Sequence, residues 1–71
     1  MSGRFIKVDG VRLRQIRQEQ ALSLRDLSES SGVAHDTINK LETGKREAQP
    51  RTIRSLAETL GVEPRELMEV R

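Results

Sequence analysis

One short stretch of this chain gathers hydrogen-bonding side chains on one side of a predicted helix. The apolar residues Ala34, Ile38 and Leu41 recur at the spacing i, i+4, i+7, which is typical of the inward face of an amphipathic helix. The opposite face of that helix then carries short polar side chains and one lysine. These residues are His35, Asp36, Asn39, Lys40 and Thr43, with Thr37 at the boundary between the faces.

The chemistry available to this polar face is hydrogen bonding to nucleic-acid bases. Asparagine can bridge N6 and N7 of adenine, lysine can reach O6 and N7 of guanine, and aspartate can accept from N4 of cytosine. We therefore predict that residues 34–43 form a helix that reads the major groove of double-stranded DNA. An ordinary solvated helix surface is the alternative. Asp36 also has a second explanation, since a carboxylate in the first turn stabilises a helix through its dipole.

Composition argues against several other kinds of site. The 71 residues include one histidine and no cysteine, so a thiol nucleophile and a cysteine-based zinc site are excluded. His35 has no second ligand nearby in the sequence and does not indicate a metal site. The sequence also has no glycine-rich loop of the kind that binds phosphate. A chain of this size has no room for a deep catalytic pocket. We predict that the protein is not an enzyme and uses no cofactor.

The charged residues are unevenly distributed along the chain. The net charge of +2, from 13 Lys+Arg and 11 Asp+Glu, says little by itself, but the basic residues concentrate within 12–17 and 40–54 while acids fill the C-terminal end. This polarity suits one side facing DNA and one side facing away. No apolar run approaches the ~18 residues of a membrane span, and no signal peptide is recognisable. We expect a cytoplasmic protein that is found at the nucleoid when bound to DNA.

Capping residues and apolar spacing define the helices that would position the polar face. Ser23 and Asp26 form a pair like a capping box, and Gly32 suits the left-handed residue that ends a helix. Two helices this short, divided by a turn at Gly32, indicate a helix-turn-helix. The predicted helices span about 10–20, 24–31, 34–43, the segment from Pro50 to Gly61, and 64–70.

The order of several short motifs gives this chain a family resemblance over residues 11–68. The motifs are L-R-x-x-R at 13–17, L-S-x-x-x-L-S at 22–28, S-G-V at 31–33, I-x-x-L-E-x-G-K-R at 38–46 and P-R-x-I-x-x-L-A-x-x-L-G-V at 50–62. In this order they resemble the Cro/repressor-type (XRE-like) helix-turn-helix family of DNA-binding regulators. The resemblance implies an all-α, compact five-helix repressor-like bundle, with an N-terminal arm at 1–9 and the DNA-binding domain at 10–71.

The resemblance also implies roles for individual residues. Arg17 and Glu42 match positions that form a structural ion pair between the first and third helices. The base-reading residues would be His35, Asp36, Thr37, Asn39 and Lys40, the first three at the end of the helix that enters the groove. Arg51 matches a position that reaches phosphate or the minor groove. Apart from the resemblance, we predict phosphate contacts for Arg25, Thr43, Lys45 and Arg46, although a solvated charge run is the alternative for the two loop cations. Leu24 departs from the glutamine common in the family, so Arg25 is the candidate to replace its phosphate contact, or is simply solvated.

The two ends of the chain leave alternatives open. Phe5 or Ile6 packs a loose arm on the bundle, or the arm forms a short strand with a symmetry mate. Met68 and Val70 form a dimer surface, or belong to the core and a frayed end. We expect a sequence-specific transcriptional regulator that is a homodimer at least on DNA. The alternative function is a protein-interaction module, such as an antitoxin or adaptor, with a protein partner.

Overall fold

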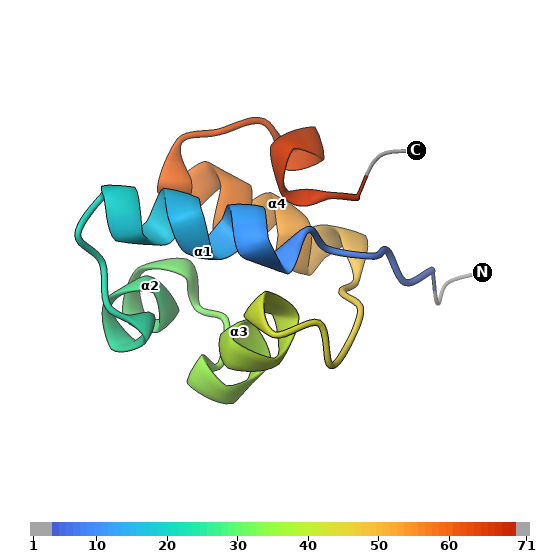
Figure 1. Cartoon of the computed structure of the whole chain (residues 1–71), viewed down its shortest axis with the longest axis horizontal. Coiled ribbons are helices and arrows are strands. Elements are labelled where there is room, and N and C mark those ends of the chain that lie inside the picture. Colours follow the sequence, from blue (N-terminus) through green and yellow to red (C-terminus); the bar gives the residue numbers. More distant parts are fainter. Residues whose placement is uncertain (1–3, 70–71) are drawn as a thin grey trace.

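The computed structural model describes residues 4–69, which form four α-helices and one short 3₁₀ helix around a single core (Figure 1). These elements are α1 (Gly10–Glu19), α2 (Leu24–Ser31), α3 (His35–Glu42), α4 (Pro50–Leu60) and the 3₁₀ helix η1 (Pro64–Leu67). Within residues 4–69 there is no strand, and only two isolated antiparallel bridges occur. The all-α prediction is confirmed.

The prediction of a fifth α-helix over residues 64–70 is wrong. Only the four residues of η1 are helical, and Met68 that follows them is extended, with φ −104° and ψ 146°. The backbone of Met68 forms an antiparallel bridge with Val8 of the arm, so the chain leaves the helix to pair with that segment. Met68 also packs against the core, and Val70 lies outside the described residues.

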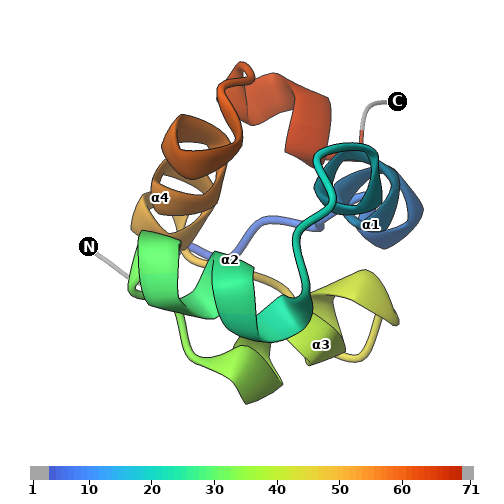
Figure 2. The ribbon, with the colours of Figure 1, turned by 90° about the vertical axis from the view of Figure 1, so that its left-hand side faces the viewer.

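The core is built from the apolar faces of all five helical elements. In Figure 2, α1 and α4 lie on opposite sides, with η1 above the space between them and α2 and α3 below. Six side chains in this space are almost completely buried: Leu13, Leu27, Ile38, Leu41, Leu56 and Leu67. Burying a leucine contributes about 1.5–3 kcal/mol relative to leaving it exposed. The core therefore fixes the faces that each helix can present to solvent.

A capping box and a glycine turn set the angle between α2 and α3. The Ser23 hydroxyl accepts a hydrogen bond from the Asp26 amide at 2.9 Å, and the Asp26 carboxylate accepts one from the Ser23 amide at 2.9 Å. The hydrogen bond from the Ser23 amide stabilises the charged form of the Asp26 carboxyl group, and this lowers the pKa of Asp26 below its usual value. Gly32 ends α2 with φ 78°, a left-handed conformation that disfavours residues with a Cβ.

The ion pair implied by the family resemblance joins α1 to α3. Arg17 Nε donates to Glu42 Oε2 at 2.6 Å, and Arg17 Nη2 donates to Glu42 Oε1 at 3.0 Å. Both residues are buried, and the Glu42 carboxylate raises the pKa of Arg17. Gly10 at the start of α1 lies so close to the carbonyl oxygens of Leu41 and Glu42 that a Cβ would overlap them. These contacts fix the C-terminal end of α3 against α1.

The N-terminal arm pairs with two other segments of the same chain. Ile6 exchanges two backbone hydrogen bonds with Ala48, at 2.7 and 3.0 Å, and the Glu69 amide donates to the Lys7 carbonyl at 3.0 Å. Ile6 packs against the core, as one of the two sequence alternatives proposed, whereas Phe5 is 51% exposed. The described arm is therefore attached to the loop between α3 and α4 and to the C-terminal segment.

Candidate nucleic-acid interface

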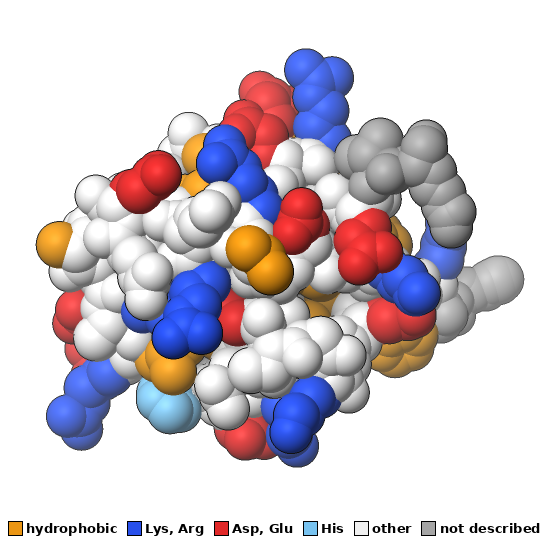
Figure 3. All heavy atoms as spheres, viewed as in Figure 1, with side chains coloured by type: hydrophobic (Ala, Val, Ile, Leu, Met, Phe, Trp, Pro, Cys, Tyr) orange, Lys and Arg blue, Asp and Glu red, His pale blue; other side chains and the backbone are white. Residues whose placement is uncertain are grey.

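The polar face of α3 is open to solvent along its whole length. His35, Asp36, Asn39 and Thr43 are exposed, and Thr37 and Lys40 are half-buried. Figure 3 shows the histidine side chain at the α2–α3 edge of the molecule, with Lys and Arg side chains on both sides of it. Ile38 and Leu41 point the other way and are fully buried.

Ala34 does not lie on the inward face that its spacing predicted, but at the helix-cap position that it matches in the family. It is the N-cap residue of α3, with φ −58° and ψ 141°, and its side chain is exposed. The helical spacing that relates it to Ile38 does not apply, because an N-cap residue has non-helical dihedral angles. Its methyl group also cannot accept a hydrogen bond from the first turn of α3, so the backbone amides at that end remain available to solvent or a ligand.

Two of the candidate base-reading residues form an ion pair with each other. Lys40 Nζ lies 3.1 Å from Asp36 Oδ2, one helical turn away on the same face. Their side chains are 45% and 72% exposed, respectively, so solvent screens the attraction, which is worth only about 0.3–0.5 kcal/mol in such pairs. The pair neutralises the middle of the polar face and places an acceptor beside a donor.

The five candidate phosphate-binding residues surround α3 but do not form one cluster. Arg25 is exposed on α2 and borders the same hollow as His35. Thr43 is the C-cap residue that follows α3, and its hydroxyl donates to the Asn39 carbonyl at 2.9 Å. Lys45 lies on the opposite side of the loop, in a hollow that it shares with Lys7 and Glu69 of the chain ends. Arg46 and Arg51 are described with the groove below.

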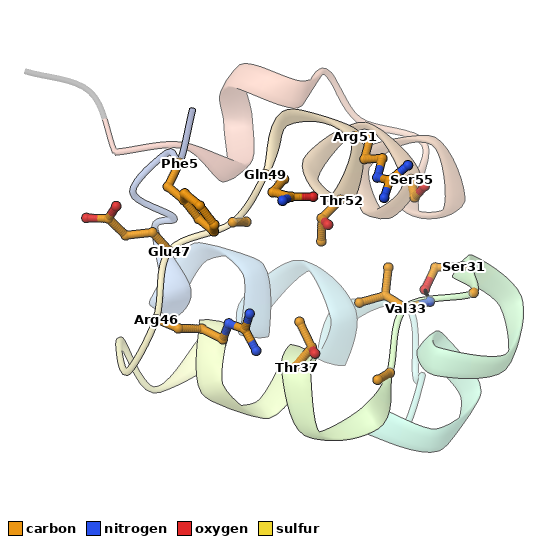
Figure 4. Close-up of a pocket in the computed structure, with 13 residues that line it drawn as sticks. Phe5, Ser31, Val33, Thr37, Arg46, Glu47, Gln49, Arg51, Thr52 and Ser55 are labelled. Carbon is orange, nitrogen blue, oxygen red and sulfur yellow. Dashed lines mark hydrogen bonds between the residues drawn. The ribbon is translucent and has the colours of Figure 1, made fainter. Parts of the chain in front are cut away.

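A groove of about 470 Å³ runs between α3 and α4. Thr37 of α3 faces it from one side and Thr52 of α4 from the other, and Arg46 and Arg51 both border it (Figure 4). The two arginines therefore border one concave surface, although one comes from a loop and the other from the first turn of α4. Cations with hydroxyl groups between them are the side chains that commonly contact the DNA backbone.

Several residues that line this groove were not predicted as site residues from the sequence, among them Phe5, Gln49 and Thr52. Phe5 reaches the groove only because the arm pairs with Ala48, and local sequence patterns do not predict such a long-range pairing. Gln49 and Thr52 lie at and just after the start of α4. The basic residues around them were a signal that could have drawn attention to their amide and hydroxyl groups.

Two short helices across a glycine turn, with the second open to solvent and flanked by cations, define a helix-turn-helix protein. The sequence profile of the family HTH_3, described as Helix-turn-helix, matches residues 13–67. The chain therefore belongs to this helix-turn-helix family, as the motifs indicated.

Individual proteins that are similar to this chain have the same fold, and several of them are named as regulators. The HTH-type transcriptional regulator DdrOP3 of Deinococcus deserti is 34% identical over 58 residues, 82% of this chain and 45% of that protein. The restriction-modification controller protein C.AhdI of Aeromonas hydrophila is 37% identical, with a TM-score of 0.79 over 83% of this chain and 89% of that one. SinR, a master regulator for biofilm formation crystallised in complex with DNA, is 26% identical, with a TM-score of 0.76 over 79% and 90%.

The chain spans less than half the length of the curated relatives it matches. The shared region is the helix-turn-helix domain, so the likeness describes this domain and not what those longer proteins do as a whole. Among residues 4–69, no helix is both long and apolar enough to cross a membrane.

Proposed function

We propose that this protein is a sequence-specific regulator of transcription that binds double-stranded DNA with α3 in the major groove. The observation that carries this proposal is the solvent-exposed polar face of α3, which is bordered by cations from α2, the following loop and α4. Relatives named as transcriptional regulators, and the likeness to a protein crystallised with DNA, support it. A cytoplasmic location, at the nucleoid when DNA is bound, follows from this role.

Within this proposal, base reading and backbone binding belong to different side chains. The residues that read bases are those exposed along α3: His35, Asp36, Thr37, Asn39 and Lys40. The residues that hold phosphates lie at its margins: Arg25, Thr43, Lys45, Arg46 and Arg51. Phosphate contacts fix the orientation of a protein on the duplex, whereas contacts to base edges specify the sequence.

We further propose that two copies bind together on DNA. One α3 contacts only a few base pairs, and helix-turn-helix proteins usually bind as dimers to two half-sites about 34 Å apart. A palindromic binding sequence would then reflect the twofold symmetry of the dimer. The surface through which the copies meet is separate from the exposed face of α3, because that face must enter the groove.

Selection of bound duplexes from random DNA, followed by affinity measurements at several salt concentrations, tests this function. We expect an enriched, palindromic sequence and an affinity that falls steeply with salt, by nearly one unit of logarithmic slope per phosphate contact. A flat salt response together with no enriched sequence would overturn the proposal. Co-purification of a protein partner in that case would instead support an interaction module such as an antitoxin or adaptor.

A further inference from the structure

Phe5, the only Phe, Tyr or Trp of the chain, is exposed at the surface on the described part of the arm. In this extended segment, Ile6 and Val8 point inward, whereas Phe5 and Lys7 point outward. Ile6 is fixed by its two hydrogen bonds to Ala48. The exposure of Phe5 is therefore a consequence of the alternation in an extended segment and of this backbone pairing.

Phe5 lies between two hollows at the edge of the proposed DNA interface. One is the groove between α3 and α4, which Arg51 also borders, and the other is a shallow hollow that includes Lys40. Arg46 and Glu47 line both hollows. Figure 4 shows the ring of Phe5 at the same end of the groove as Arg46. An apolar ring thus sits beside a candidate phosphate-binding residue and close to a candidate base-reading residue.

We propose that Phe5 is an additional DNA contact, whose ring packs on a deoxyribose of the strand that Arg46 holds by a phosphate. This inference rests on the proposed function. A nucleic-acid strand alternates anionic phosphates with apolar sugar faces, and the surface here offers a cation and an aromatic ring side by side. The position of Lys40 places this contact next to the bases that α3 reads. The arm thereby extends the interface beyond the helix-turn-helix.

A purely structural role explains the position of Phe5 poorly. The residue is outside the buried core cluster, where Ile6 and Val8 supply the apolar contacts of the arm. Half of its surface remains in water in the free protein, which is unfavourable for an apolar ring. Covering the ring with a sugar removes that surface from water. Glu47 lines the same hollows, and its negative charge repels DNA phosphates as well as an acidic protein segment, so the experiment must distinguish DNA from a protein partner.

The test compares Phe5→Ser with Arg46→Gln and Val11→Ser on a selected duplex and on an unrelated duplex across a range of salt concentrations. Val11 is a matched control, because it is 70% exposed on α1 and borders none of the hollows around Phe5. We expect Phe5→Ser to weaken binding to both duplexes about tenfold, as for an apolar side chain left in water, with an unchanged salt slope. Arg46→Gln should reduce that slope by about one. Val11→Ser should bind as the unchanged protein does.

Several outcomes would overturn the inference without touching the proposed function. The first is that Phe5→Ser binds as tightly as the unchanged protein, and the second is a loss of affinity confined to one duplex. The third is a change in oligomeric state, which would assign Phe5 to a contact between proteins. Phe5→Leu keeps an apolar side chain of similar size and so controls for a folding defect caused by serine. We expect this variant to retain most of the affinity for DNA, and a tenfold loss would count against the sugar contact. Failure of the unchanged protein to bind either duplex would instead remove the proposed function.

Discussion

The guanidinium of Arg17 and the carboxylate of Glu42 form a two-pronged ion pair between the last turn of α1 and the last residue of α3. A third hydrogen bond, from Arg17 Nη1 to the Leu22 carbonyl at 2.8 Å, attaches the segment before α2 to the same side chain. One buried arginine thus holds together the three elements that set the orientation of the exposed face of α3.

Removing one partner of this pair should destabilise the fold. We expect Glu42→Ala to lower the free energy of unfolding by about 3 kcal/mol, because the Arg17 charge would remain buried and unpaired. Replacing both partners, as in Arg17→Met with Glu42→Leu, should recover much of that loss. The exposed pair Arg25–Glu29, at 3.8 Å, provides the control: Arg25→Ala should change stability by less than about 0.5 kcal/mol. Urea unfolding measures all three variants, and equal losses for Glu42→Ala and Arg25→Ala would contradict the prediction.

A second prediction follows from the ion pair between Asp36 and Lys40, and it depends on the proposed function. Asp36→Asn removes a negative charge from the exposed face of α3 and releases Lys40 from its partner. We expect tighter binding to all duplexes and a salt slope steeper by up to about one, since one more cation becomes available to DNA. The asparagine amide can also bridge adenine, so the preferred base at the contacted position should change from cytosine to adenine. Selection from random DNA with both proteins tests this, and identical preferred sequences would contradict it.

Local rules of sequence predicted the α-helices well because their start and stop signals act locally. The predicted bounds 24–31 are those of α2, and the helix that starts at Pro50 ends before Gly61 as expected. The errors arose where a distant segment decides the backbone: Met68 is extended because it pairs with Val8. The place of Phe5 in the groove between α3 and α4 was likewise beyond reach, since it depends on the pairing of Ile6 with Ala48.

Ala34 leaves α3 without a side-chain cap, so a capping residue at this position should stabilise the fold. The extended dihedral angles at this residue suit a serine N-cap, and its side chain is exposed. Ala34→Ser should raise the free energy of unfolding by about 1 kcal/mol, because the hydroxyl can accept a hydrogen bond from the first turn of α3. Ser23→Ala, which removes the existing cap of α2, should lower it by a similar amount. Thermal unfolding of both variants measures the effects, and no stabilisation by Ala34→Ser would show that another group already satisfies those amides.

The capping box of α2 should make stability depend on pH through Asp26. Its pKa is lowered from the ordinary value of 3.8, chiefly because its carboxylate accepts a hydrogen bond from the Ser23 amide. A carboxyl with a depressed pKa in the folded state stabilises that state above the unfolded pKa, and the contribution is lost as the pH falls through the folded pKa. Asp26→Asn keeps an oxygen that can accept the hydrogen bond but removes the charge. We therefore expect the difference in unfolding free energy between the two proteins to be largest near neutral pH and to diminish below pH 3.8. Urea unfolding over this pH range measures it, and a difference that stays constant with pH would show that the charge of Asp26 does not stabilise α2.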